Sequence, residues 1–111
     1  MQHTETALPV GKLVRDGIPQ IIRDSGAEPI TYVAGPEEYR DRLRAKISEE
    51  CQEVLEAGAE DVPGEVADLV EAALAYAADF GVSAEEVEEI RAAKAAERGG
   101  FAGRVIWTGN R

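Results

Sequence analysis

The sequence is poor in the side chains that carry nucleophilic and redox chemistry in many enzymes. Its 111 residues include one cysteine, Cys51, and one histidine, His3. A single cysteine forms no internal disulfide, and one histidine in a polar N-terminal stretch favours neither a zinc site nor a Ser–His–Asp triad. We expect Cys51 to be a small core residue of a protein kept in the reducing cytoplasm.

Long apolar runs and basic residues are also scarce. No stretch approaches the ~18 apolar residues that a membrane helix needs, and the N-terminus lacks the basic start and apolar stretch of a secretory signal. Lys and Arg number 12 against 22 Asp and Glu, which gives a net charge of −10. Nucleic-acid binders present a basic surface, so we expect neither a nucleic acid nor a membrane as a partner.

The spacing of apolar residues predicts one all-α domain, at residues 12–111, behind a flexible tail at residues 1–11. A capping box formed by Ser83 and Glu86 marks the start of the last helix. The domain is expected to be a bundle of a short N-terminal helix and three main helices, at about 17–23, 37–57, 64–80 and 84–98.

Two β-branched segments, 29–33 and 104–108, are predicted to form short strands. The residues predicted to be buried on the first two main helices are Tyr39, Leu43, Ile47, Cys51, Val54, Val66, Leu69, Val70, Ala73, Leu74 and Ala77. Because the helices are apolar on more than one side, the small bundle is expected to complete its core as a homodimer.

Acidic residues recur at helical spacing on these two helices. Glu50 and Glu53 are three residues apart on the first, as are Glu65 and Asp68 on the second, so each pair shares one helix face. A short connection makes the helices antiparallel neighbours, which allows the two pairs to converge. Close carboxylates repel one another unless a cation joins them, and Mg²⁺ prefers such hard oxygen ligands. The spacing therefore favours an Mg²⁺ site.

A solvated acidic surface is the alternative, because acid pairs three residues apart are common on exposed helices. Helical phase places Glu50 within or at the edge of the apolar stripe, where an unpaired carboxylate would cost on the order of several kcal/mol. Glu65 and Asp68 fall on the opposite side from the apolar residues of their helix, where a solvated face would have the same pattern. Spacing alone leaves both interpretations open.

Three motifs resemble one enzyme group. Glu49-Glu50-x-x-Glu53 followed by Glu65-x-x-Asp68 resembles the signature of the all-α nucleotide pyrophosphatases: MazG proteins, phosphoribosyl-ATP pyrophosphohydrolase, and dCTPase-like and dimeric dUTPase enzymes. Residues 12–19, Lys-Leu-Val-Arg-Asp-Gly-Ile-Pro, resemble the start of the MazG-like "house-cleaning" phosphohydrolases, with glycine at position 17 where that group usually has lysine. Residues 94–101, Lys-x-x-x-Arg-Gly-Gly-Phe, resemble that group's C-terminal motif.

This resemblance implies an Mg²⁺-dependent enzyme that hydrolyses a nucleoside triphosphate, non-standard ones included, to a nucleoside monophosphate and pyrophosphate. It implies that the ligands of Mg²⁺ are Glu50, Glu53, Glu65 and Asp68. Glu49 would orient or deprotonate the attacking water. Contacts to the substrate phosphates are implied for Lys94 and Arg98, with Lys12 and Arg15 as further candidates.

Other interpretations remain beside these. Without the Gly-Gly-Phe that follows, Lys94 and Arg98 would be ordinary cations at a helix C-terminus. Lys46 can reach the acidic residues one turn on, or form a simple helix pair with Glu50. For the whole chain, the alternatives are a non-catalytic acidic helical interaction module and, among enzymes, phosphoribosyl-ATP pyrophosphohydrolase. The motifs do not specify the preferred base or sugar.

Overall fold

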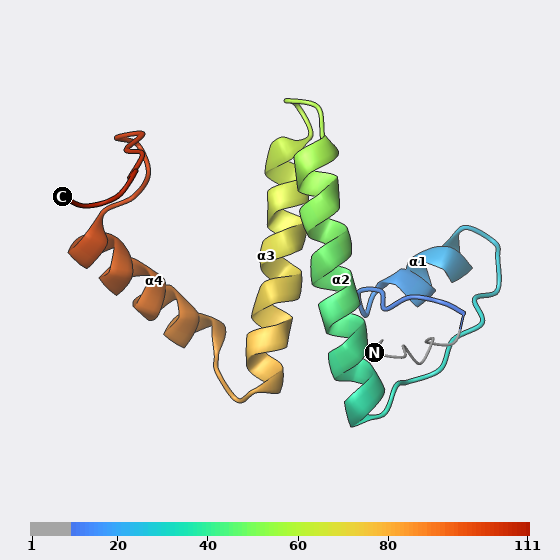
Figure 1. Cartoon of the computed structure of the whole chain (residues 1–111). Coiled ribbons are helices and arrows are strands. Elements are labelled where there is room, and N and C mark those ends of the chain that lie inside the picture. The colour runs from blue at the N-terminus through green and yellow to red at the C-terminus, as the bar shows by residue number, and fades with distance from the viewer. Residues whose placement is uncertain (1–9) are drawn as a thin grey trace, which may run out of the picture.

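The computed structural model describes residues 10–111, and this part of the chain forms four α-helices and no strand. The helices are α1 (Ile18–Asp24), α2 (Pro36–Glu56), α3 (Val62–Asp79) and α4 (Ala84–Arg98) (Figure 1). The all-α fold and the four predicted helices are therefore confirmed. His3 and most of the predicted tail lie outside the described residues.

Local sequence sets the starts of the long helices. The sequence predicted that α3 begins at about residue 64, but the helix already begins at Val62, because Pro63 fits a first helical turn, where its missing N–H is not needed. The predicted capping box of α4 is confirmed. The Glu86 N–H donates to the Ser83 hydroxyl at 3.1 Å, and the Ser83 N–H donates to the Glu86 carboxylate at 3.1 Å.

Helices α2 and α3 pack side by side as an antiparallel hairpin, and the core lies between them (Figure 1). Leu43 from α2 and Ala72 from α3 are the buried apolar residues of the described part of the chain. Arg40 ties the base of the hairpin together. Its Nε donates to Asp79 Oδ2 at 2.6 Å, and its guanidinium lies 3.8 Å from the centre of the Phe80 ring. The hairpin thus holds the two acidic helices in a fixed register.

A glycine turn ends α3 and directs α4 away from the hairpin. Gly81 has a φ of 85°, and the N–H groups of Gly81 and Val82 donate to the carbonyls of Ala78 and Ala77, which is a Schellman motif. Among the described helices α4 contacts α3 alone, and none of its residues is buried. In Figure 1, α4 lies on the side of the hairpin opposite α1.

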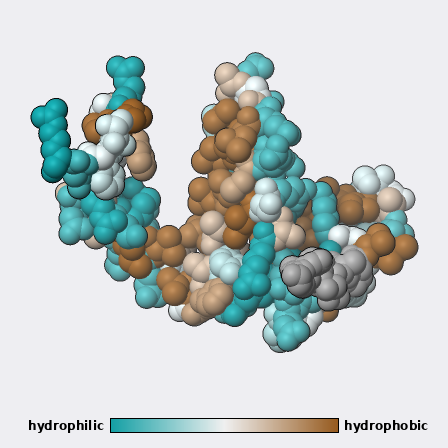
Figure 2. Space-filling view, viewed as in Figure 1, coloured by the Kyte–Doolittle hydropathy of each residue, from teal (hydrophilic) through white to brown (hydrophobic). Residues whose placement is uncertain are grey.

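A single copy of the chain is not compact. Its radius of gyration is 18.1 Å, against about 13 Å for a compact domain of this length. Val66 and Val70 are 40% and 47% exposed, Ala73 and Cys51 are exposed as well, and Figure 2 shows hydrophobic surface along α3. The prediction of burial is wrong at these positions, because they lie on faces of α2 and α3 that no neighbour within the described chain covers.

Neither predicted strand forms. No described segment pairs with residues 29–33 or 104–108, and Tyr32, Val105 and Ile106 are largely exposed. Composition alone predicted these strands, but a strand requires a hydrogen-bonding partner, which these segments lack. Separately, none of the helices in residues 10–111 has the length and apolar character to cross a membrane.

Candidate functional site

The C-terminal half of α2 carries Glu49, Glu50 and Glu53. Glu50 follows the buried Leu43 by two helical turns, so the two side chains share a face. The side chain of Glu50 is 8% exposed, and its Oε1 atom accepts no hydrogen bond from any described residue. The predicted position of Glu50 within the apolar stripe is confirmed. A buried carboxylate oxygen without a donor needs a positive charge nearby.

Helix α3 brings the second acidic pair to Glu50. Oxygen atoms of Glu50, Glu65 and Asp68 all lie within 4.8 Å of one another. The Oε1 atom of Glu65 is also buried without a hydrogen-bond partner among the described residues. We call Glu49, Glu50, Glu53, Glu65 and Asp68 the carboxylate cluster.

Crowding in the carboxylate cluster changes the acidity of Glu65. Partial burial raises the pKa of Glu65 above its ordinary value of 4.5, and the negative charge and contact of Glu53 raise the pKa further. Asp68 and Glu50 act in the same direction. All of these effects disfavour the ionised form of Glu65, and a bound cation would favour it.

Lys46 lies one helical turn before the acidic residues of α2. Its Nζ atom is 3.4 Å from Glu49 Oε1 and 3.5 Å from Glu50 Oε2, and its side chain is 22% exposed. The sequence left open whether Lys46 reaches the acidic residues or only pairs with Glu50. The structure shows that it contacts two members of the carboxylate cluster.

The segment before α1 supplies two more cations. Arg15 donates to Asp68 Oδ1 at 2.7 Å, and Lys12 Nζ lies 3.8 Å from Glu49 Oε2. These contacts join residues far apart in the sequence. The two predicted N-terminal phosphate contacts therefore lie at the carboxylate cluster within one chain.

Arg42 anchors this N-terminal segment on α2. Its buried guanidinium donates to the Gly11 carbonyl at 2.7 Å, directly before Lys12, and its Nε donates to Glu38 at 3.0 Å. The Tyr32 hydroxyl also donates to Glu38, and this hydrogen bond is the main reason that the pKa of Glu38 is lowered. The network holds Lys12 within reach of the carboxylate cluster.

A cavity of about 550 Å³ opens beside the carboxylate cluster, between the N-terminal segment and the hairpin. This volume is typical of small-molecule sites. The apolar walls of this cavity were not predicted from the sequence, which placed Tyr39 only among the buried residues of its helix. The charged lining residues are Lys12, Arg15, Asp16, Lys46, Glu50, Asp68 and Glu71, and the others are Leu13, Val14, Ile18, Tyr39, Leu43, Ala72 and Ala75.

The donor set fits a hard divalent cation. Mg²⁺ is usually held by one or two carboxylates and completed by water and phosphate oxygens. Glu50 Oε1 and Glu65 Oε1 are buried oxygens that lack a donor among the described residues, so they are suited to this role. The carboxylate cluster also carries five acids against three adjacent cations, Lys12, Arg15 and Lys46. One divalent cation would balance that difference.

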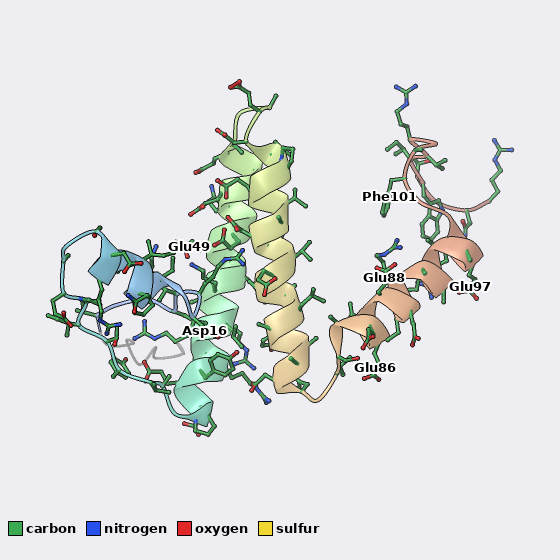
Figure 3. All side chains as sticks on the ribbon, turned by 180° about the vertical axis from the view of Figure 1, so that it is seen from behind. Asp16, Glu49, Glu86, Glu88, Glu97 and Phe101 are labelled. Atoms are coloured by element: carbon green, nitrogen blue, oxygen red, sulfur yellow. The ribbon has the colours of Figure 1, made fainter. Side chains whose placement is uncertain are left out.

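Lys94 and Arg98 are not brought to the carboxylate cluster within one chain. Both lie on the exposed helix α4, where Arg98 pairs with the neighbouring Glu97 at 3.5 Å. In Figure 3, Glu49 lies on the α1 side of the hairpin, whereas Glu97 and Phe101 lie at the far end of α4. The predicted C-terminal phosphate contacts are therefore separated from the predicted metal ligands.

Comparison with known proteins identifies relatives of the chain. Residues 20–95 match the family described as "Phosphoribosyl-ATP pyrophosphohydrolase", a range that contains the whole carboxylate cluster. An uncharacterized protein of Mycolicibacterium smegmatis (strain ATCC 700084 / mc(2)155) is 40% identical over 52 residues, which cover 47% of this chain and 53% of that protein. The chain thus spans about half the length of this relative. No solved structure matches this chain.

Proposed function

The chain belongs to the phosphoribosyl-ATP pyrophosphohydrolase family, and from this premise we propose that it hydrolyses a nucleoside triphosphate between the α- and β-phosphates with Mg²⁺. The products are a nucleoside monophosphate and pyrophosphate. One observation carries the proposal: Glu50 Oε1 and Glu65 Oε1 are buried without a donor from residues 10–111, in a cluster that faces a cavity with cationic lining residues. An acidic surface without a ligand would leave its carboxylate oxygens in water.

Glu50, Glu65 and Asp68 are the residues that would hold the metal, with Glu53 beside Glu65. When bound, Mg²⁺ lowers the pKa of a coordinated water and offsets negative charge on the attacked phosphate. Glu49 is suited to orient that water and accept its proton, because its side chain is 38% exposed at the rim of the carboxylate cluster.

The cavity has both cationic and apolar lining residues, which suit the phosphates and the base of a nucleotide. Lys12, Arg15 and Lys46 are the groups that would bind phosphate oxygens and take up the charge on the departing pyrophosphate. The apolar wall, which includes Tyr39, would receive the base and sugar and limit access of bulk water. A side chain at Gly17 would meet open space, so packing does not require glycine at the position where the group that residues 12–19 resemble usually has lysine.

A second copy of the chain is part of the proposal. Leu55 of α2 is 80% exposed, and Val62, Val66 and Val70 of α3 are 36–47% exposed. These side chains form apolar surface that a monomer leaves in water, which is typical of a protein that associates. A homodimer that covers α3 would complete the core.

Pyrophosphate release tests the activity directly. The panel contains standard, deoxy and oxidised nucleoside triphosphates together with phosphoribosyl-ATP, each with Mg²⁺ and with EDTA. We expect Mg²⁺-dependent formation of a monophosphate and pyrophosphate in equal amounts. Release of orthophosphate would contradict cleavage between the α- and β-phosphates. No turnover of any compound would support the non-catalytic interaction module, and turnover of phosphoribosyl-ATP alone would reassign the substrate.

A further inference from the structure

Two cations pair with carboxylates that the proposed Mg²⁺ site also uses. Arg15 donates to Asp68 Oδ1 at 2.7 Å, and Lys46 Nζ lies 3.5 Å from Glu50 Oε2. All four side chains line the same cavity. A carboxylate that ligates a divalent ion attracts a second cation less, and the two positive groups repel each other. Lys46, Arg15 and the metal ion therefore compete for Glu50 and Asp68.

We propose that Lys46 and Arg15 exchange partners during the binding cycle. Both cations leave Glu50 and Asp68 when a divalent cation binds, and both then bind the phosphate oxygens of the nucleotide in the shared cavity. This inference rests on the proposed function and adds an order of binding to it: the divalent cation enters before the nucleotide.

The exposure of the Arg15–Asp68 pair and the flexibility of the Lys46 side chain make such an exchange feasible. The side chains of Arg15 and Asp68 are 56% and 46% exposed, and ion pairs of this kind are weak enough to be broken by a competing ion. Lys46 carries its ammonium on a flexible four-carbon stem, so it can turn from Glu50 into the cavity without movement of α2.

The charge balance explains the order. The carboxylate cluster has five acids and only three adjacent cations, so a triphosphate that arrives first meets a net negative site with its cations already paired. After a divalent ion binds, the charges of the carboxylate cluster and its adjacent cations are balanced, and the cations are released. The nucleotide is then attracted instead of repelled.

Arg91 offers a matched control. It pairs with Glu88 at 2.7 Å, the same distance as in the Arg15–Asp68 pair, and its side chain is 64% exposed. Arg91 lies on α4 and does not line the cavity. R91Q therefore removes the same charge from the same kind of ion pair at a different place.

The first measurement is an Mg²⁺ titration followed by thermal unfolding, without nucleotide. We expect R15Q to lower the Mg²⁺ concentration at half-maximal stabilisation by about two- to fivefold, the range that an exposed ion pair supports. K46Q should lower it at least as far, because the Lys46–Glu50 pair is less exposed. R91Q should leave it unchanged. Because Arg15 is half-exposed, R15Q carries this test even if K46Q fails to fold.

The second measurement is calorimetric binding of an α,β-methylene nucleoside triphosphate. Wild type should bind this analogue at least about tenfold more tightly with Mg²⁺ than with EDTA, and R15Q and K46Q should weaken binding in Mg²⁺ by about ten- to a hundredfold. Equal binding by wild type with and without Mg²⁺ would overturn the order. Unchanged binding of Mg²⁺ or of the analogue in R15Q would overturn the exchange. If wild type still releases pyrophosphate in either case, the proposed function stands and only this inference fails.

Discussion

Replacing Glu50 by glutamine removes one buried charge while it keeps the shape of the side chain. Glu50 is 8% exposed, and its oxygen atoms lie close to those of Glu65 and Asp68. Glutamine is not an anionic ligand, and the loss of groups one shell further from a metal already costs about 10–100-fold. We therefore expect Glu50→Gln to lower Mg²⁺-dependent hydrolysis by at least about a hundredfold.

The same change should not destabilise the protein in EDTA. At an effective dielectric constant of about 20, a carboxylate 4.8 Å away, the outer limit for Asp68, repels Glu50 by about 3.5 kcal/mol. The ammonium of Lys46, at 3.5 Å, attracts it by about 4.7 kcal/mol. Glu65 adds repulsion, and burial of the charge adds a desolvation penalty. Repulsion and desolvation therefore exceed the attraction, so we expect a gain in stability of about 2 kcal/mol, or a rise in Tm of about 10 °C.

Thermal unfolding and pyrophosphate release on the same samples test both statements. Wild type should gain about 2.7 kcal/mol at an Mg²⁺ concentration a hundred times its Kd, and Glu50→Gln should lose most of this gain. Glu56→Gln, an exposed position on the same helix, should behave as wild type. Retained turnover in Glu50→Gln would show that Glu50 is not a ligand. A loss of several kcal/mol of stability in EDTA would show that cations of the protein already offset the negative charge of Glu50 in full.

Glu65, Val70 and Arg98 provide three further tests. The folded protein raises the pKa of Glu65 above 4.5 and so binds its proton more tightly than the unfolded chain; this stability is lost as pH rises through the raised pKa. In EDTA, Glu65→Gln should therefore flatten the decline of Tm above pH 4.5, and an unchanged decline would contradict the assignment. Val70→Glu places a charge on the exposed face of α3 and should shift a dimer to monomers in sedimentation experiments, whereas Val33→Glu, at a 97% exposed position, should not. Arg98→Ala should lower kcat/KM about ten- to a hundredfold without a change in Tm, and an unchanged kcat/KM would exclude Arg98 from the phosphate site.

Features set by neighbours along the chain were predictable. Ser83 and Glu86 form the predicted capping box because their spacing alone places each within reach of the other's N–H. Glu50 is buried because it follows Leu43 by two helical turns on a face that α3 covers. The short connection between α2 and α3 then brings Glu65 and Asp68 to Glu50, as the spacing predicted. These are consequences of helical geometry, which a single sequence contains.

Contacts between distant segments were not predictable in the same way. Arg15 and Asp68 are 53 residues apart, and no local pattern states that the chain before α1 returns to α3. The resemblance named Arg15 as a candidate, but only the fold places it against a proposed metal ligand. The cavity beside Tyr39 was not predictable for the same reason, since its walls come from the N-terminal segment and from both helices of the hairpin.

The exposed stripe of α3 and the remote position of Lys94 and Arg98 share a physical cause. Apolar periodicity shows how much surface a helix can bury and does not show which chain covers it. At 1.5 Å per residue, Arg98 lies about 20 Å along α4 from Ala84, on a helix directed away from its own carboxylate cluster. Residues 47–71 contain nine acids and no base, whereas residues 91–111 contain five bases and one acid, so the two regions are electrostatically complementary.

Val70→Glu tests whether the basic residues of a second chain complete the acidic site. If partner cations complete the site, the monomeric variant should keep the Mg²⁺-dependent rise in Tm, because the proposed metal ligands all lie on one chain. In that case its kcat/KM should also fall about as far as in Arg98→Ala, and Arg98→Ala within Val70→Glu should add little further loss. A monomer with full kcat/KM would show that one chain holds every group that the reaction needs. In that case Lys94 and Arg98 are surface cations of α4.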